Sequence, residues 1–520
     1  MNLLRKITLS TIVLLCTLYL FSQPGVLDNS FNGNGLVITN GANGIHDNGR
    51  AVLVQSDEKI IVVGSSEGRV GLIRYTPDGN LDSSFGSNGI VLTPYGNDNI
   101  YGLCAVLQDD EKIIVGGAIS VSSNYDFAVL RYNTDGSLDD SFGLNGIASK
   151  DLGVYEVGFA VDLQADGRIL LAGTSSEMMG DYALVRFNQD GTLDETFGSD
   201  GSVVIENSGM HDEIYGVKIK PDGKIVASGY SRNFNNDISD FMILQLNNDG
   251  SLDESFNSTG IVVTDFISGS LDESTSIAVQ PDGKIIAGGV SEAASDQDFA
   301  LARYNSDGSL DQSFNQTGLV RTNLGSFDDY ATALCLQPDG KIILAGFASS
   351  PTDVDYVIVR YNIDGTIDES FGNNGMTWTD FGVGDDKAKA ICLDHDGKIL
   401  VAGYSGDLPA SDFDYSLARY LNDLSIGLID FSESSYHLLV FPNPIQNNTT
   451  LEYELNDDEI ISLSLYDYSG NCIKHFFTSQ IREKGEHWEV LNIDPTIPTG
   501  NYLLVLGNGK HYRSIRISIK

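Results

Sequence analysis

The sequence is poor in several residue types, and each shortage excludes a class of protein. Its 520 residues include 12 prolines, 5 cysteines and 2 tryptophans. Such low counts exclude a proline-rich, collagen-like or disulfide-dense chain. Basic residues are also scarce, because 31 Lys and Arg stand against 72 Asp and Glu and leave a net charge of −41. This charge repels nucleic acid and anionic membrane surfaces, so we expect no nucleic-acid partner.

The motifs of common enzyme families are missing from the sequence as well. The seven histidines show no HExxH or other metal-ligand spacing. No Gly-x-Ser-x-Gly elbow, Walker loop or dinucleotide fingerprint in a βαβ setting is present. We therefore name no catalytic residue and no cofactor other than Ca²⁺, and an enzyme is the less favoured interpretation. A hydrolase or lyase with two acidic residues stays open, because such residues meet only in space.

Long apolar runs are confined to the N-terminus. Arg5 and Lys6 precede an apolar run from Ile7 to Phe21, and Ser22 follows it. This pattern predicts a secretory signal peptide over residues 1–22, with no transmembrane segment after its removal. Cys16 lies inside the run, and a lipid-attachment cysteine is the weaker alternative there. The other cysteines (Cys104, Cys335, Cys392 and Cys472) are interpreted as buried thiols rather than bridges.

The dominant feature of the chain is a repeat of 54 to 59 residues. A Leu/Ile-Asp-x-Ser/Thr-Phe segment begins at Leu27, Leu81, Leu138, Leu193, Leu252, Leu310 and Ile367. Each repeat contains four short β-type runs bounded by Gly, Asp or Asn, in the order A (Ala-Val-x-x-Gln), B (Lys-Ile-Ile-Val-x-Gly), C (Phe-Ala-Leu-x-Arg-Tyr) and D (Gly-Ile-Val-x-Thr). Asp-Gly-Lys between A and B predicts a tight hairpin. The sequence therefore predicts an all-β, seven-bladed propeller over residues 23–423, in which an N-terminal D strand closes the last blade.

The two recurring segments resemble the delta-60 repeats of secreted bacterial propeller proteins. They are the Asp-Gly-Lys-Ile-x-x-x-Gly hairpin and the Gly-x-Leu-Asp-x-Ser-Phe-Gly-x-x-Gly connector, and together they recur over about 400 residues. The resemblance implies a propeller and brings no activity. The first repeat departs from the pattern because it lacks the Asp-Phe entry to strand C.

The period stops after Tyr420, and residues 437–520 form a second module behind a linker over 424–436. Its apolar runs predict a small Ig-like β-sandwich. Its motifs resemble the type A sorting domain of the type IX secretion system of Bacteroidetes, and the residues that carry this likeness include Phe441, Pro442, Asn443, Pro444, Gly500, Tyr502 and Lys520. The resemblance implies contact with the secretion machinery, export across both membranes, and release or surface anchoring. A sandwich with a structural, carbohydrate-binding-like role is the alternative.

Two groups of residues are candidates for binding on the propeller face formed by the B–C and D–A loops. The first is the predicted B–C loop that contains Tyr230, Arg232, Asn233 and Phe234, because variable loops on a rigid scaffold usually carry binding. A solvated loop is its plain alternative. The second is an acidic column expected to ring the channel mouth, at Asp47, Glu156, Asp212, Asp272, Asp329 and Asp386, broken by Ile100. These carboxylates either hold Ca²⁺ or a polyol, or accept backbone N–H bonds in the D–A turns.

An arginine recurs at the end of strand C, and Gln245 replaces it in the fourth repeat. We expect this arginine to pair with the connector aspartate, as Arg131 with Asp139. The leading functional hypothesis is a non-catalytic surface or secreted binding propeller whose partners are glycans or surface proteins. The alternatives are a polysaccharide hydrolase or lyase with acidic residues at the channel, and a structural spacer or adhesin.

Overall fold

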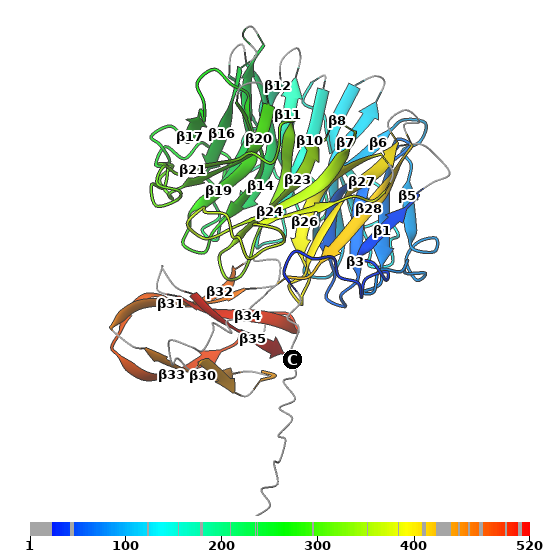
Figure 1. Ribbon diagram of the computed structural model, residues 1–520. Helices are drawn as coiled ribbons and strands as arrows, with labels where there is room; N and C mark the ends of the chain where they lie inside the picture. The colour runs from blue at the N-terminus through cyan, green and yellow to red at the C-terminus, as the bar shows by residue number, and fades with distance from the viewer. Residues whose placement is uncertain are drawn as a thin grey trace, which may run out of the picture.

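The computed structural model describes residues 23–520 with several gaps, at 42–45, 122–123, 154, 177–179, 208–209, 235, 237, 294–295, 351, 383, 408–411, 423–437, 442, 446–447, 456–457, 467–471, 495–496 and 508–511. The predicted signal peptide (1–22), the linker (424–436) and Pro442 lie outside the described residues. All the described secondary structure is β-strand, in two modules (Figure 1). None of the described residues belongs to a helix long and apolar enough to cross a membrane.

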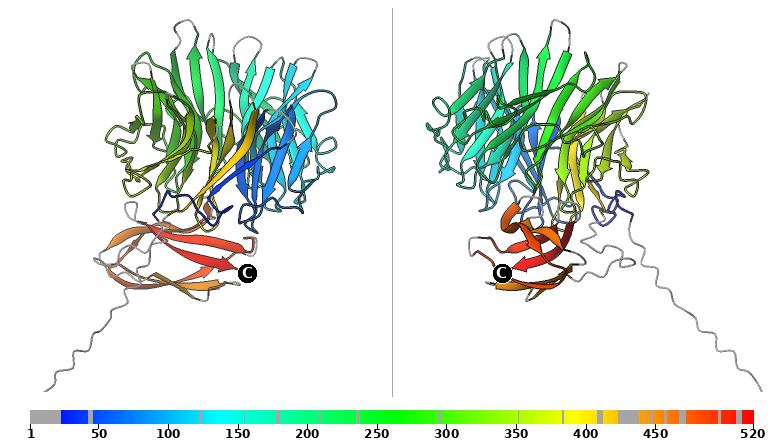
Figure 2. Two further views of the ribbon diagram at one scale, coloured as in Figure 1. Left: turned by 45° about the vertical axis from the view of Figure 1, so that its right-hand side comes forward. Right: turned by 90° about the vertical axis from the view of Figure 1, so that its left-hand side faces the viewer.

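The first module is a propeller of seven four-stranded antiparallel blades (Figures 1 and 2). The innermost, A strands are β2 (Asp47–Val54), β6 (Ile100–Leu107), β10 (Tyr155–Leu163), β14 (His211–Ile219), β18 (Asp272–Val279), β22 (Asp329–Leu336) and β26 (Asp385–Leu393). The B strands are β3 (Ile60–Ser66), β7 (Ile113–Val121), β11 (Ile169–Ser176), β15 (Ile225–Asn233), β19 (Ile285–Ala293), β23 (Ile342–Ser349) and β27 (Ile399–Asp407).

The outer half of each blade consists of its C and D strands. The C strands are β4 (Arg69–Tyr75), β8 (Asn124–Tyr132), β12 (Gly180–Phe187), β16 (Ile238–Leu246), β20 (Asp296–Tyr304), β24 (Val354–Tyr361) and β28 (Asp412–Tyr420). The four-residue D strands are β5 (Ile90–Thr93), β9 (Ile147–Lys150), β13 (Ser202–Ile205), β17 (Ile261–Thr264), β21 (Leu319–Thr322), β25 (Met376–Thr379) and the N-terminal β1 (Leu36–Thr39). Strand β1 pairs with β28, so the start of the chain completes the seventh blade as predicted.

The hydrophobic core lies between neighbouring blades. Ile61 and Leu72 of the first blade share one buried cluster with Val115 and Leu130 of the second. Strands that are buried on both faces have nearly continuous apolar sequences. In this propeller the B and C strands, such as β3 and β4, are buried on both faces. The A strands alternate between buried and half-exposed residues, because one side of each A strand faces the axis of the propeller.

One polar contact recurs in six of the seven blades and confirms the predicted arginine–aspartate pairing. Arg131 Nε donates to Asp139 Oδ2 over 2.8 Å, and its guanidinium lies over the ring of Phe142 at 4.6 Å. Arg131 Nη1 also donates to the carbonyl of Gln189 in the next blade. Asp139 accepts further from Ser141 and from Lys112, the lysine of the Asp-Gly-Lys hairpin at its equivalent position. We call this set of contacts the blade clamp.

The same clamp recurs around the ring with one substitution. The equivalent Arg–Asp distances are 2.7 to 2.9 Å for Arg74–Asp82, Arg186–Asp194, Arg303–Asp311, Arg360–Asp368 and Arg419–Asp28. In the fourth blade, Gln245 Nε2 donates to Asp253 over 2.6 Å and Lys224 Nζ lies 2.7 Å from the same oxygen. The aspartate therefore keeps a cationic partner where the arginine is absent.

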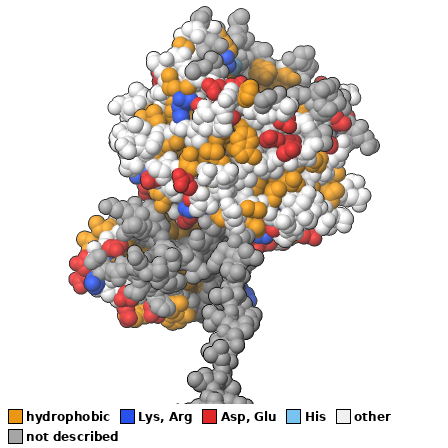
Figure 3. Space-filling model, in the orientation of Figure 1, with side chains coloured by type: hydrophobic (Ala, Val, Ile, Leu, Met, Phe, Trp, Pro, Cys, Tyr) orange, Lys and Arg blue, Asp and Glu red, His pale blue; other side chains and the backbone are white. Residues whose placement is uncertain are grey.

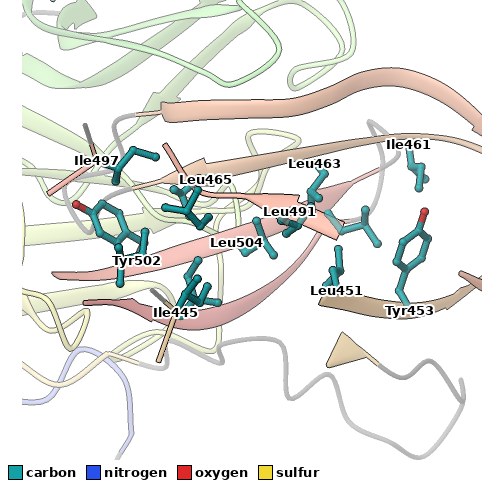
Figure 4. Close-up of a cluster of buried hydrophobic side chains, with 14 of the residues drawn as sticks. Ile445, Leu451, Tyr453, Ile461, Leu463, Leu465, Leu491, Ile497, Tyr502 and Leu504 are labelled. Carbon is teal, nitrogen blue, oxygen red and sulfur yellow. The ribbon is translucent and has the colours of Figure 1, made fainter. Parts of the chain in front are cut away.

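The second module is a β-sandwich of two sheets. One sheet has the order β29 (Leu438–Phe441), β30 (Asn448–Leu455) and β33 (Gly485–Asn492); the other has the order β32 (Cys472–Arg482), β31 (Glu459–Tyr466), β34 (Gly500–Gly507) and β35 (Tyr512–Ile519). Figure 4 shows Leu451 and Tyr453 of the first sheet opposite Leu463 and Leu504 of the second. That this sandwich is Ig-like stays a prediction.

The sandwich lies against the propeller face that carries the A–B and C–D connections (Figure 2). Tyr466 and Val505, both buried on the outer side of the four-stranded sheet, line a cavity of about 500 Å³ together with the A–B turns at Pro281 and Pro338. The face formed by the B–C and D–A loops is on the opposite side of the propeller. On the side of the molecule seen in Figure 3, acidic side chains form several separate groups rather than one patch.

We expect the blade clamp to contribute strongly to stability. Arg131→Leu removes the guanidinium that donates to the buried carboxylate of Asp139. The loss should lower the free energy of unfolding by about 3 kcal/mol. Arg131→Gln reproduces the fourth blade, keeps a donor and should cost about 1 kcal/mol. Urea unfolding of the mature chain, followed by circular dichroism, measures both. Equal losses in the two variants would contradict a hydrogen-bonded clamp.

The clamp also predicts a loss of stability in acid. Burial by itself raises the pKa of Asp28, but hydrogen bonds from Lys398 and Ser30 and the charge of Arg419 lower it to about 2, and the pKa of Asp82 and of Asp368 is likewise about 2. A lowered native pKa stabilises the fold above the ordinary pKa of about 4, and this stabilisation is lost as the pH falls from about 4 toward 2. Melting temperatures measured across this range should fall steeply. A flat profile down to pH 2.5 would count against the prediction.

Candidate functional site

Every A strand carries a β-bulge at the same position. The register with strand B shifts between Gly49 and Ala51 in the first blade and at the equivalent step in the other six. A bulge leaves one residue outside the ladder and redirects its side chain. The seven extra residues are Arg50, Leu103, Phe159, Tyr215, Thr275, Thr332 and Lys389.

All seven bulge residues line one cavity of about 730 Å³, which is enclosed by the A strands and therefore follows the axis of the propeller. We call it the channel. Its volume lies within the range of small-molecule sites, about 300–1,000 Å³. Further lining comes from Tyr230, Arg232, Glu273 and Tyr330. The channel therefore takes its chemistry from a repeated backbone feature with variable side chains.

Two glutamates from neighbouring A strands form the acidic side of the channel region. Glu213 of β14 accepts hydrogen bonds from Tyr215 Oη at 2.6 Å and Tyr230 Oη at 2.8 Å, and its Oε1 lies 3.2 Å from His211 Nε2. Glu273 of β18 accepts from Tyr330 Oη at 2.7 Å. Arg232 Nη1 lies 3.8 Å from Glu273 Oε1.

The surroundings of the two glutamates shift their pKa values in opposite directions. Burial opposes the ionisation of Glu213, but the hydrogen bonds from His211, Tyr215 and Tyr230 outweigh it and hold the pKa of Glu213 below its usual range. Burial raises the pKa of Glu273, and the nearby charge of Glu213 adds to this against the effects of Tyr330 and Arg232. Two carboxyl groups whose pKa values are shifted in opposite directions are the arrangement that acid–base catalysis uses.

Aromatic rings surround these glutamates. The Phe159 and Tyr215 rings are stacked with centroids 4.7 Å apart, and Tyr215 and Tyr230 are stacked at 6.0 Å. Tyr330 stacks on Phe347 at 5.6 Å. These flat faces offer packing to a ligand, and the tyrosines among them also carry a hydroxyl group that can form hydrogen bonds.

Basic residues lie across the ring, on the first and seventh blades. Arg50 and Lys389 line the channel, and the Lys389 ammonium lies 4.9 Å from the centre of the Phe347 ring. The Arg50 Nε atom is buried and has no hydrogen-bond partner among the described residues. Burial lowers the pKa of Lys389 to about 7, and the charges of Arg50 and Lys387 add to the effect. This side of the channel is suited to an anionic group, even though the protein is strongly acidic overall.

The predicted ligand residues lie beside the acidic side of the channel. Tyr230, Arg232 and Asn233 belong to strand β15 rather than to a loop, which corrects the expected loop boundary. Strands β15 and β16 extend outward and shorten the connection that the sequence indicated. Phe234 follows, is 54% exposed, and lies 5.2 Å from the His211 ring and 5.6 Å from the Arg232 guanidinium.

The predicted acidic column does not form the channel wall. Asp47, Glu156, Asp212, Asp272, Asp329 and Asp386 are at most 1% exposed, and none of them is among the residues that line the channel. They lie at junctions between blades, where strand A begins. Four accept a backbone N–H from the preceding D–A turn, as Asp329 does from Leu324 at 2.9 Å and Asp386 does from Phe381 at 2.7 Å. One carboxylate oxygen of each of these four thus holds the D–A turn. The expectation of a ring at the channel mouth is wrong, because these side chains point toward the preceding blade.

Glu213, Glu273 and the bulge residues were not predicted from the sequence. A signal for the bulges was present, since in most repeats one variable residue stands between two small residues of strand A, as in Gly49-Arg50-Ala51, Ala331-Thr332-Ala333 and Ala388-Lys389-Ala390. Only the strand register shows that this residue faces the axis.

The sorting-motif residues join the ends of the sandwich. Ser518 N donates to Asn443 Oδ1 at 2.8 Å, and Lys520 N donates to the carbonyl of Ile445, which follows Pro444. Gly500 begins β34, and buried Tyr502 donates from its hydroxyl to the carbonyl of Pro498. Phe441 ends β29 and is 50% exposed.

The fold and the channel define a modular class of protein: a closed propeller with a ligand-sized axial cavity and an appended β-sandwich. Seven segments of the chain match the family model described as "Domain of unknown function (DUF5122) beta-propeller", at 55–85, 108–142, 164–197, 220–256, 280–314, 337–371 and 395–426. Residues 439–520 match the "Secretion system C-terminal sorting domain". Both predicted resemblances are thus confirmed, and the protein is exported through the type IX system to the cell surface or beyond. No protein of curated function matches the sequence.

Several solved structures are similar to the chain at low sequence identity. The polysaccharide lyase Uly1 is 12% identical with a TM-score of 0.42, covering 73% of this chain and 91% of the lyase. A protein of unknown function from Dyadobacter fermentans is 12% identical with a TM-score of 0.40, covering 61% and 94%. PorZ, a surface component of the type IX secretion system of Porphyromonas gingivalis, is 10% identical with a TM-score of 0.22, covering 91% and 81%. Likeness at this level supports no inference about activity.

Proposed function

We propose that this exported propeller binds an acidic oligosaccharide or polysaccharide segment in its channel. The observation that carries the proposal is the convergence of seven bulge side chains on one cavity of about 730 Å³. Stacked aromatic rings provide flat surfaces for sugar rings, while Glu213 and Glu273 accept hydrogen bonds from hydroxyl groups. Arg50 and Lys389 supply donors for a carboxylate or sulfate on the sugar.

The location of the channel agrees with this role. The sorting domain lies on the opposite propeller face, so it does not cover the end of the channel near His211 and Phe234. Export places that end outside the cell, where polysaccharides are available. A purely structural spacer would gain nothing from a buried arginine Nε without a partner, because such a group costs free energy.

Binding is tested by calorimetry of the mature chain with uronate-containing oligosaccharides. Tyr215→Ala removes a stacking face and Lys389→Met removes a cation, so each should weaken binding at least about tenfold, which corresponds to about 1.4 kcal/mol. Leu144→Ala is the matched control, because Leu144 is an apolar side chain, 78% exposed, on the other propeller face. Unchanged affinity in both channel variants would refute the site.

A second candidate function is hydrolysis of the bound glycan, and the opposite pKa shifts of the two glutamates favour it. Glu273, whose pKa is raised, would protonate the leaving oxygen, and Glu213, whose pKa is lowered, would act as base or nucleophile. This division of roles matches the way glycosidases use paired carboxyl groups.

Turnover is tested by release of reducing ends from the same oligosaccharides. Glu213→Gln and Glu273→Gln should each lower kcat at least about a hundredfold while binding persists. The rate should rise as Glu213 ionises and fall at higher pH as Glu273 loses its proton, which gives a bell-shaped profile. Binding without turnover would leave the non-catalytic function, and unsaturated products would indicate elimination instead of hydrolysis.

A further inference from the structure

Each junction between two blades brings together three equivalent positions on the face of the B–C and D–A loops. They are the residue before the apolar part of strand C, the residue after strand D, and the acidic-column residue that begins strand A of the next blade. At the β8–β9–β10 junction these are Asp126, Asp151 and Glu156; at the β24–β25–β26 junction they are Asp355, Asp380 and Asp386. In each group, one carboxylate oxygen from every residue lies within 4.8 Å of the others.

This spacing fits a calcium ion. Ca²⁺ binds oxygen ligands at about 2.3–2.6 Å, so two ligands of one ion are at most about 5 Å apart. Three carboxylates at this distance without a cation repel one another strongly. A cation bound between the three carboxylates would offset this repulsion, and the chain supplies none at these two junctions among the described ion pairs.

Unpaired buried oxygens point to the same conclusion independently. Glu156 and Asp386 are fully buried, yet Glu156 Oε2 and Asp386 Oδ1 have no hydrogen-bond partner in the described part of the chain. Asp355 Oδ1 is also buried and without a partner. Buried carboxylate oxygens left this way cost free energy unless a ligand satisfies them.

Other junctions of the same ring act as internal comparisons. Where Asn323 replaces the acid after strand D, Arg321 forms an ion pair with Asp298. At the ring closure, Asn40 stands at that position and donates to Asp414 at 2.8 Å. At the β4–β5–β6 junction all three acidic positions are lost together, to Arg69, Pro94 and Ile100. At these three junctions the chain thus replaces some of the acids or pairs them itself, although Asp47 Oδ1, Asp298 Oδ1 and Asp329 Oδ1 are also buried without a hydrogen-bond partner in the described part of the chain. The β12–β13–β14 junction keeps three acids, Asp181, Glu206 and Asp212, but they are not among the groups whose carboxylate oxygens lie within 4.8 Å of one another.

The β16–β17–β18 junction also has three acids, Asp240, Asp265 and Asp272, but both oxygens of Asp272 are bonded, to Ser270 Oγ and Phe266 N. Asp272 therefore has no buried oxygen without a hydrogen-bond partner, unlike Glu156 and Asp386 in the other two groups. From these comparisons we propose that the β8–β9–β10 and β24–β25–β26 junctions each bind a Ca²⁺ ion that cross-links two neighbouring blades. Exposed Asp151 and Asp380 provide the entry route for the ion.

The test is calcium titration of the mature full-length chain after treatment with a chelator. Calorimetry should show binding, and about 5 mM Ca²⁺ should raise the melting temperature, since extracellular calcium modules bind with dissociation constants of about 10⁻⁴–10⁻³ M. Mg²⁺ should give a smaller shift, because it demands a tighter octahedral site. No heat and no change in melting temperature would overturn the proposal.

Single and double variants test whether these residues bind the two Ca²⁺ ions. Asp126→Asn and Asp355→Asn should each weaken one site at least tenfold and remove about half of the calcium-dependent shift, and the double variant should remove most of it. Glu369→Gln, at an exposed acid on the opposite face, is the matched control and should behave as wild type. A double variant that responds to Ca²⁺ like wild type would refute these sites.

A further measurement separates ion binding from general damage to the fold. In chelator, Asp355→Asn should melt at or above the temperature of wild type, because it relieves repulsion between like charges. With Ca²⁺ present it should melt below wild type. A variant that is equally destabilised with and without Ca²⁺ would show that Asp355 has only a structural role.

Discussion

The propeller depends on the blade clamp. One guanidinium joins three parts of the fold: its Nε binds the connector aspartate, its face covers the connector phenylalanine, and its Nη1 reaches a group in the next blade. The ring is closed by the same means, since Arg419 of the last blade binds Asp28 from the start of the chain and reaches the carbonyl of Pro77. Buried arginine tolerates this location because its donors are nearly all satisfied.

The clamp explains why so much of the fold could be predicted from the sequence. The aspartate and phenylalanine of the connector, Asp139 and Phe142 in the second repeat, recur in every repeat because each makes a contact of the clamp. The Ser141 position is Ser or Thr, since the hydroxyl of Thr196 makes the same hydrogen bond. The lysine of the hairpin recurs for a related reason, since it lies beside the same aspartate. Where the arginine is missing, Gln245 and Lys224 supply the donors to the aspartate. The fourth blade therefore forms the same contact although its sequence departs from the repeat.

The site was harder to predict, because side-chain direction depends on register. Glu213 and Asp212 are neighbours in the chain, yet Glu213 bonds with the tyrosines of the channel region while Asp212 is buried at the junction between blades. Adjacent residues of a strand point to opposite faces of the sheet. A column of equivalent residues chosen from the sequence can therefore point into the blade junction instead of the channel. The bulge adds a second uncertainty, because it shifts the alternation at one step of every A strand.

The residues of the clamp and the residues that line the channel therefore belong to different columns of one repeat. The clamp occupies the connectors on the face where the sorting domain lies, and its residues are nearly constant. The bulge residues can vary from blade to blade, because the side chain of a residue outside the ladder faces the channel rather than a blade core. Arg50, Leu103 and Tyr215 can thus occupy equivalent positions in blades of the same backbone. A substitution in the bulge column changes what the channel can bind while the ring that forms the channel remains intact.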